Sequence, residues 1–110
     1  MGYKEENDYR RFIGHLKILS MQADYKQNKE TAEEYKHTYK MLDKIRVRRY
    51  LAQIGEETEE KKLYNQIIQM INEKYDESNK STEELVKAIN ENIDYEYEEE
   101  NKKEEIVEER

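Results

Sequence analysis

Proline is absent from this chain of 110 residues, and glycine occurs only at Gly2, Gly14 and Gly55. These two residue types interrupt helices most strongly, whereas the abundant Glu, Lys, Gln and Leu favour helix. The composition therefore predicts an all-α fold with roughly two thirds or more of the residues in helices, against about one third in an average protein. Gly55 is the clearest interior stop signal.

The spacing of the apolar residues divides the chain into helices. Apolar side chains recur every three or four positions, which predicts helices over about 8–27, 31–54, 58–76 and 82–94. We expect a three- to four-helix antiparallel bundle over residues 1–93. Thr31 and Glu34 fit a capping box that would start the second helix, and one continuous helix from Tyr9 to Ile54 is the alternative.

The second predicted helix has an apolar stripe that changes sides. Its first half places Tyr35, Tyr39, Leu42 and Ile45 on one face, and its second half places Val47, Tyr50, Leu51 and Ile54 on roughly the other. Such a helix would pack against different elements along its length. Gly55 would then end it as the left-handed residue after the C-cap.

The same helix carries the main concentration of positive charge. This basic ridge comprises Lys36, Lys40, Lys44, Arg46, Arg48 and Arg49. Cations beside tyrosines can hold phosphates and stack bases, which suggests nucleic-acid binding. The ridge could equally pair with the chain's own acids, bind a protein or form a solvated helix face.

The C-terminal end is strongly acidic. Residues 94–110 contain nine acidic and three basic residues, a net −6 of the total −7, so residues 1–93 carry only −1. A segment this charged cannot bury enough apolar surface to offset its ordering entropy, and we expect frayed helix or disorder. This tail could solubilise the chain, fold back on the ridge or dock on a basic partner through Tyr95, Glu96, Tyr97, Glu98, Glu99 and Glu100.

Some apolar residues lie outside the expected core. They form two association patches, the first comprising Ile18, Met21 and Tyr25 and the second Val47, Leu51 and Ile54. A lean core with surplus apolar surface favours self-association or a stable protein partner. A homodimer is therefore expected in preference to a monomer.

Site chemistry is sparse in this sequence. Cysteine is absent, and His15 and His37 belong to no metal-ligand spacing, so no metal, cofactor or disulfide is expected. Ser20 is five residues from His15, whereas side chains that are neighbours on a helix are three or four residues apart. The pair is therefore not spaced as a nucleophile and its base. No apolar run has the length of a membrane span or signal sequence, so we expect a cytoplasmic protein that is not an enzyme.

These features favour a non-enzymatic protein-interaction factor. By analogy from small size and a composition rich in Lys, Glu, Asn, Ile and Tyr, the profile suits a phage or mobile-element accessory protein. Such a protein would bind and inhibit or redirect a host protein, for example one of a defence system. The alternative is a nucleic-acid-binding or replication-associated accessory protein that uses the basic ridge.

Overall fold

The computed structural model describes residues 3–51, 55–75 and 81–96, and within them the regular structure is entirely helical. The elements are α1 (Tyr3–Tyr25), α2 (Lys29–Arg48), the single 3₁₀ turn η1 (Arg49–Leu51), α3 (Glu59–Lys74) and α4 (Ser81–Asn92). The described residues contain four α-helices and no strand. This confirms the predicted all-α class.

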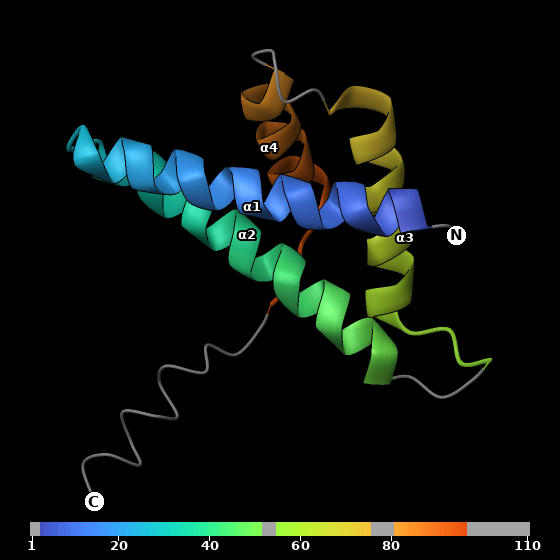
Figure 1. The fold of residues 1–110 in the computed structure, drawn as a ribbon. Coiled ribbons are helices and arrows are strands. Elements are labelled where there is room, and N and C mark those ends of the chain that lie inside the picture. The colour runs from blue at the N-terminus through green and yellow to red at the C-terminus, as the bar shows by residue number, and fades with distance from the viewer. Residues whose placement is uncertain (1–2, 52–54, 76–80, 97–110) are drawn as a thin grey trace, which may run out of the picture.

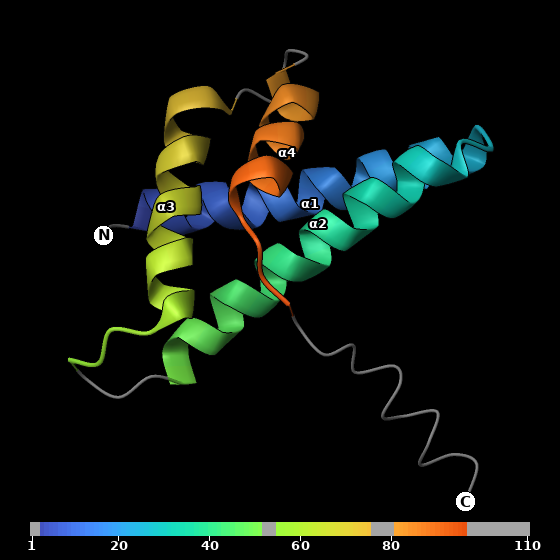
Figure 2. The same ribbon diagram turned by 180° about the vertical axis from the view of Figure 1, so that it is seen from behind.

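The helices form two antiparallel pairs (Figure 1). α1 and α2 lie side by side as a long hairpin, while α3 and α4 run in opposite directions and cross that hairpin steeply (Figure 2). The crossing covers the hairpin toward the N-terminus of α1. The hairpin's turn end, with the last part of α1 and the first part of α2, extends beyond α3 and α4.

The turn between α1 and α2 confirms two helices rather than one continuous helix. Gln27 adopts a left-handed conformation with φ 64°. The amides of Gln27 and Asn28 donate to the carbonyls of Asp24 (2.9 Å) and Ala23 (2.8 Å), a Schellman ending for α1. The predicted cap at Thr31 is wrong, because the Asn28 side chain accepts from the Thr31 amide (3.3 Å) and starts α2 three residues earlier.

Two further helix ends differ from the sequence prediction. α1 already begins at Tyr3, and Glu5 and Glu6 in its first turn favour the positive end of the helix dipole. α2 ends at Arg48 and tightens into η1 rather than continuing to Ile54, and residues 52–54 lie outside the described part. Gly55 has the expected positive φ of 84°, but it follows that interval and is not the C′ residue of α2.

The core joins all four helices. Tyr9, Phe12 and Leu16 of α1 are fully buried, and the Tyr9 hydroxyl donates to the Leu42 carbonyl of α2 (2.8 Å). The complete buried apolar cluster is Tyr9, Phe12, Ile13, Leu16, Met41, Leu42, Ile45, Tyr64, Ile67, Ile68, Ile71, Leu85, Val86, Ile89, Ile93 and Tyr95. α4 is also tied to α2 by a side-chain hydrogen bond from Asn90 Nδ2 to Thr38 Oγ1 (3.0 Å).

The predicted change of apolar side in α2 is not found. Val47 and Tyr50 are 45% and 61% exposed, so the second stripe does not pack against another helix in the described structure. Arg49 takes the inward position instead, with a side chain only 12% exposed. Val47 already lies on the solvent side of α2, and the helix tightens into η1 at Arg49, which changes the direction of the side chains that follow.

Candidate functional site

The outer face of α1 carries three of the five exposed large apolar side chains of the described structure. Ile18, Met21 and Tyr25 are 54%, 72% and 90% exposed. They lie opposite the buried Tyr9, Phe12 and Leu16, as helical spacing requires. The first predicted association patch is therefore a real surface feature, whose use in binding stays a prediction.

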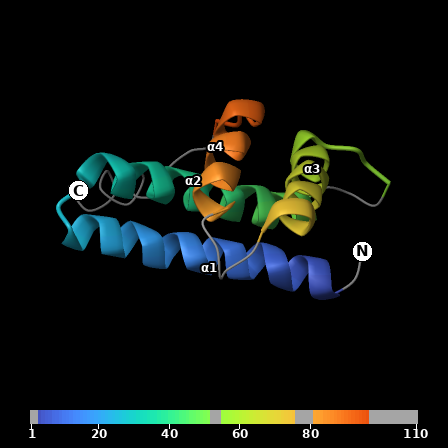
Figure 3. The same ribbon diagram turned by 90° about the horizontal axis from the view of Figure 1, so that it is seen from above.

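This patch lies on the free end of the hairpin. α3 and α4 cross the other half of α1, so the turn end projects past them (Figure 1). Seen from above, α1 forms one edge of the molecule, with the other three helices on its opposite side (Figure 3). The outer face of α1 is thus accessible along its length to another macromolecule.

The second predicted patch is only partly described. Val47 is exposed on α2, whereas the side chain of Leu51 and all of Ile54 lie outside the described residues. The exposed apolar residues of the described structure are therefore concentrated on α1, with Val47 and Tyr50 apart from them.

The basic ridge divides into an outer line of lysines and an inner set of arginines. Lys36 is exposed and Lys40 and Lys44 are half-buried on the solvent side of α2. Arg46 pairs with Asp43 on the same helix, with Nη2 at 3.0 Å from Oδ1. Arg48 donates from Nη1 to the Tyr95 hydroxyl (3.3 Å). The six cations therefore do not form one continuous ridge.

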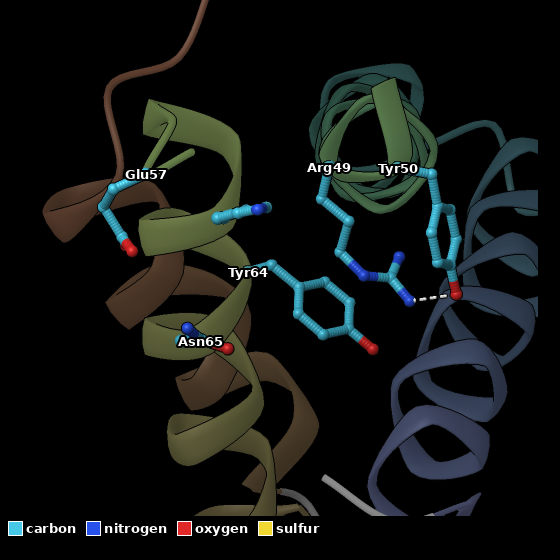
Figure 4. A pocket seen from close by; sticks show the side chains of 6 residues that line it. Arg49, Tyr50, Glu57, Tyr64 and Asn65 are labelled. Carbon is cyan, nitrogen blue, oxygen red and sulfur yellow. Dashed lines mark hydrogen bonds between the residues drawn. The ribbon is translucent and has the colours of Figure 1, made fainter. Parts of the chain in front are cut away.

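Arg49 is the centre of a cluster that joins α1, α2 and α3 (Figure 4). The carbon of its guanidinium group lies 3.8 Å from the Tyr64 ring centre and 3.9 Å from the Tyr50 ring centre. Its Nη2 donates to Glu6 Oε1 (3.2 Å) and to the Tyr50 hydroxyl, and its Nη1 donates to the Arg46 carbonyl. Tyr64 also packs on Tyr9, with ring centres 4.7 Å apart. Hydrogen bonds and cation–π contacts thus occupy both edges and faces of the guanidinium group.

The cluster shifts the titration of its members. The hydrogen bond from Tyr50 to Glu6 (2.8 Å) is the main cause of a lowered pKa of Glu6, which Arg49 lowers further. The same bond raises the pKa of Tyr50. Burial raises the pKa of Tyr64 and, more strongly, that of Tyr9. At neutral pH the cluster therefore holds one ionised carboxylate, one guanidinium and neutral tyrosines.

A pocket of about 270 Å³ borders this cluster. Its lining comprises Arg49, Tyr50, Glu57, Lys61, Tyr64 and Asn65. The Arg49 guanidinium is already engaged by Glu6, and Lys61 Nζ donates to the Glu56 carbonyl (2.6 Å). Two of the three charged groups that line this pocket, Arg49 and Lys61, are thus engaged in contacts within the fold.

The start of the predicted acidic tail belongs to the folded body. Ile93 and Tyr95 are buried, with Tyr95 only 8% exposed, and Glu96 is exposed. The Tyr95 hydroxyl donates to Glu60 Oε2 of α3 (2.8 Å) and accepts from Arg48 of α2. Tyr95 is therefore corrected from a partner-binding residue to a core residue. Tyr97, Glu98, Glu99 and Glu100 lie outside the described residues.

The histidines and serines have structural surroundings. His15 Nδ1 is 3.1 Å from the Tyr75 hydroxyl, and Ser20 donates to the Ala32 carbonyl (2.9 Å) in the hairpin. His37 is exposed on α2. In the part of the chain that the structure describes, no three His, Cys, Asp or Glu side chains are grouped to hold a metal ion.

Sequence reasoning missed three members of these sites. Glu6 lies in a stretch without apolar periodicity, and its pairing with Arg49 spans 43 residues. Tyr64 fits the apolar spacing of the third predicted helix, and that spacing does not indicate that its ring contacts a cation. Gly14 attracted no role, although a glycine inside a helix with no turn nearby is a signal that a close approach could have been sought there.

Comparison with known proteins places this chain in no group. No family model, no curated protein and no solved structure matches it. No helix of the described residues is both long and apolar enough to cross a membrane.

Proposed function

We propose that this chain is a non-enzymatic protein-interaction factor that binds through the outer face of α1. The observation that carries the proposal is the exposure of Ile18, Met21 and Tyr25 on one helical face. Contiguous exposed apolar surface is unfavourable for an isolated protein and is typical of interaction sites. Long flexible methionine and exposed tyrosine are side chains enriched at protein interfaces.

The size of this patch fits a complex of moderate affinity. Burying one large apolar side chain contributes about 1.5–3 kcal/mol. A micromolar complex requires about 8 kcal/mol, after the costs of association are met. Three such residues contribute about 4.5–9 kcal/mol before those costs, so each should be important for binding and the surrounding contacts must supply the rest.

The surroundings of the patch support binding rather than chemistry. The titratable groups with shifted pKa lie mainly in the Arg49 cluster and beside Tyr95, where they bond to one another. The described outer face of α1 holds the exposed apolar side chains of Ile18, Met21 and Tyr25. Recognition through one helical face is a common mode of binding between proteins.

The biological role we propose is that of an accessory factor of a phage or mobile element. In this role the chain binds a host protein, such as a component of a defence system, and inhibits or redirects it. Small size, high charge and an exposed binding helix support this role by analogy. The chain would act from the cytoplasm and would need no cofactor.

Capture of partners from a native host lysate tests the proposal. The tagged wild-type chain should retain a specific protein, and Met21→Glu should lose it because a charge is placed in the apolar contact. Val47→Glu is the matched control, since it places the same charge at another exposed apolar position on α2. Equal capture by all three proteins would show that the α1 face is not the binding site.

A second function, nucleic-acid binding, is favoured by one observation. Lys36, Lys40 and Lys44 follow one another at helical spacing on the solvent side of α2. If all three contact phosphates of B-DNA, the logarithm of affinity should fall by about 2.7 per tenfold rise in salt, at about 0.9 for each contact. No binding to duplex or single-stranded DNA at low salt would exclude this function.

A further inference from the structure

Gly14 lies in the middle of α1, where the fold gives no reason for a glycine. Among residues other than proline, glycine is the least favourable inside a helix. A Cβ atom built at Gly14 would meet no atom of the described chain within 4 Å, beyond the helix's own backbone. Gly14 therefore makes room on the outer surface and not inside the fold.

This opening belongs to the apolar face of α1. Gly14, Ile18, Met21 and Tyr25 are separated by four, three and four residues, so they form one stripe along the helix. On this face Gly14 forms a recess, and the larger side chains of Ile18, Met21 and Tyr25 project beside it. Another helix could approach closely at Gly14 and be held by the side chains beyond it.

We propose that a second copy of this chain occupies the face, with the two α1 helices packed antiparallel about a two-fold axis near Ile18. In this arrangement Met21 of each copy enters the recess at Gly14 of the other. Gly14 and Met21 are seven residues apart, two helical turns, so both recesses are filled at once. This inference rests on the proposed function in using the same surface, for which a host protein would compete with the second copy.

The charges beside the stripe match this pairing. Arg10 and Asp24 are both exposed and lie on the same flank of the apolar stripe. Antiparallel packing places Arg10 of one copy near Asp24 of the other, and does so twice by symmetry. Parallel packing would place Arg10 and Asp24 at different levels along the helix pair and would not bring them together. Lys17, which lies between them, directs its ammonium toward α2, with Nζ 5.7 Å from the Tyr39 ring centre.

The position of α1 permits such a dimer. α1 lies along one edge of the molecule, with α2, α3 and α4 on its inner side (Figure 3). Its 23 residues span about 35 Å, a length sufficient for a continuous helix–helix contact. The dimer would leave the lysines on the solvent side of α2 accessible on both copies.

Sedimentation equilibrium of the full chain with Gly14→Leu gives the first test. The wild type should be a dimer, and Gly14→Leu should weaken dimerisation by at least about tenfold because leucine fills the recess. Its circular dichroism and unfolding midpoint should show an intact fold, since the inside of the protein has no atom near that position. Gln66→Leu, which adds the same side chain at an exposed position of α3, should remain dimeric.

Cysteine cross-linking tests the orientation, because the natural chain has no cysteine. Ile18→Cys should form a disulfide-linked dimer under mild oxidation. Gly14→Cys alone should not, since antiparallel copies would hold these positions about 10 Å apart along the axis, beyond the reach of a disulfide. A mixture of Gly14→Cys and Met21→Cys chains should link. Linking of Gly14→Cys to itself would overturn the antiparallel arrangement.

Failure of this inference is distinguishable from failure of the proposed function. A wild-type chain that is monomeric at about 200 µM, well above a micromolar dissociation constant, would overturn the dimer. If Met21→Glu then still abolished capture of a different protein, the α1 face would remain the binding site. A dimer unaffected by Gly14→Leu and Met21→Glu would also overturn the inference, by placing the contact elsewhere.

Discussion

The guanidinium group of Arg49 lies over the ring of Tyr64, with its central carbon 3.8 Å from the ring centre. Tyr50 contacts the same guanidinium and Glu6 accepts a hydrogen bond from it. One side chain of η1 thereby links α1 to α3. Five predictions about this cluster and about other buried groups can be measured.

Arg49→Lys should destabilise the fold by about 1–2 kcal/mol, because a lysine ammonium cannot stack as a plane or donate in several directions at once. Urea unfolding followed by circular dichroism measures this change. Arg46→Lys is the matched control, since Arg46 pairs with Asp43 on its own helix and its loss should cost less than about 0.5 kcal/mol. Equal effects of the two substitutions would contradict a structural role for the stacking.

Glu6→Gln should reduce stability at pH 7 by about 1 kcal/mol, a modest amount because the carboxylate is 35% exposed. The pKa of Glu6 is lowered from its ordinary value of 4.5, so its contribution is present above that pH and is lost as pH falls through the folded-state pKa. Wild type and variant should therefore converge in acid. Glu83→Gln, which removes a surface pair with Lys87, should show little difference at either pH.

Tyr9→Phe should cost about 0.5–1.5 kcal/mol at neutral pH, because the Leu42 carbonyl loses its buried hydrogen-bond donor. Burial raises the pKa of Tyr9 well above 10.0, so the unfolded chain ionises first and stability falls as pH rises beyond about 10. Tyr9→Phe should make this alkaline loss shallower. An unchanged pH dependence in urea titrations would show that Tyr9 does not contribute to it.

Tyr95→Ala should destabilise the fold by about 2–3 kcal/mol, because it removes a buried ring and the bonds to Glu60 and Arg48. Glu96→Ala is the neighbouring control, and as an exposed position it should change stability by less than about 0.5 kcal/mol. Thermal unfolding of both variants shows whether Tyr95 contributes to the folded core while its neighbour Glu96 does not. An unchanged unfolding temperature in Tyr95→Ala would show that Tyr95 is not part of the core.

Thr82→Val should stabilise the protein by about 1 kcal/mol. The Thr82 hydroxyl is buried and has no hydrogen-bond partner among the residues that the structure describes, and valine has nearly the same shape without the polar atom. The urea midpoint should rise with an unchanged slope. Thr38→Val should have the opposite effect, because the Thr38 hydroxyl bonds to both the Glu34 carbonyl and Asn90.

Several parts of the fold followed from local sequence alone. The apolar spacing of Tyr9, Phe12 and Leu16 correctly predicted the buried side of α1, and thereby the exposed side with Ile18 and Met21. A period near 3.6 residues determines both faces of a helix at once. The start of α2 was misplaced because Asn28 and Thr31 are both good caps and the spacing cannot rank them.

The candidate sites depended on contacts that no local pattern records. Whether Arg46, Arg48 and Arg49 point outward or inward is decided by Asp43, Tyr95, Glu6 and Tyr64, most of them distant in the chain. The number of cations exposed along the basic ridge is therefore smaller than the sequence suggests. The acidic tail was likewise started too early, because the burial of Tyr95 comes from α2 and α3 and not from its charged neighbours.

The sequence by itself determined the helical class, the four helices and the apolar face left exposed on α1, because propensity and periodicity act over a few residues. Only the tertiary structure decided that α3 and α4 cross the hairpin, that Arg49 is enclosed by Tyr50, Tyr64 and Glu6, and that Gly14 opens outward. Those outcomes depend on which surfaces meet between segments that are separate in the chain, as with Glu6 and Arg49, 43 residues apart. Such meetings are set by packing and charge in three dimensions, which neighbours along the chain do not encode.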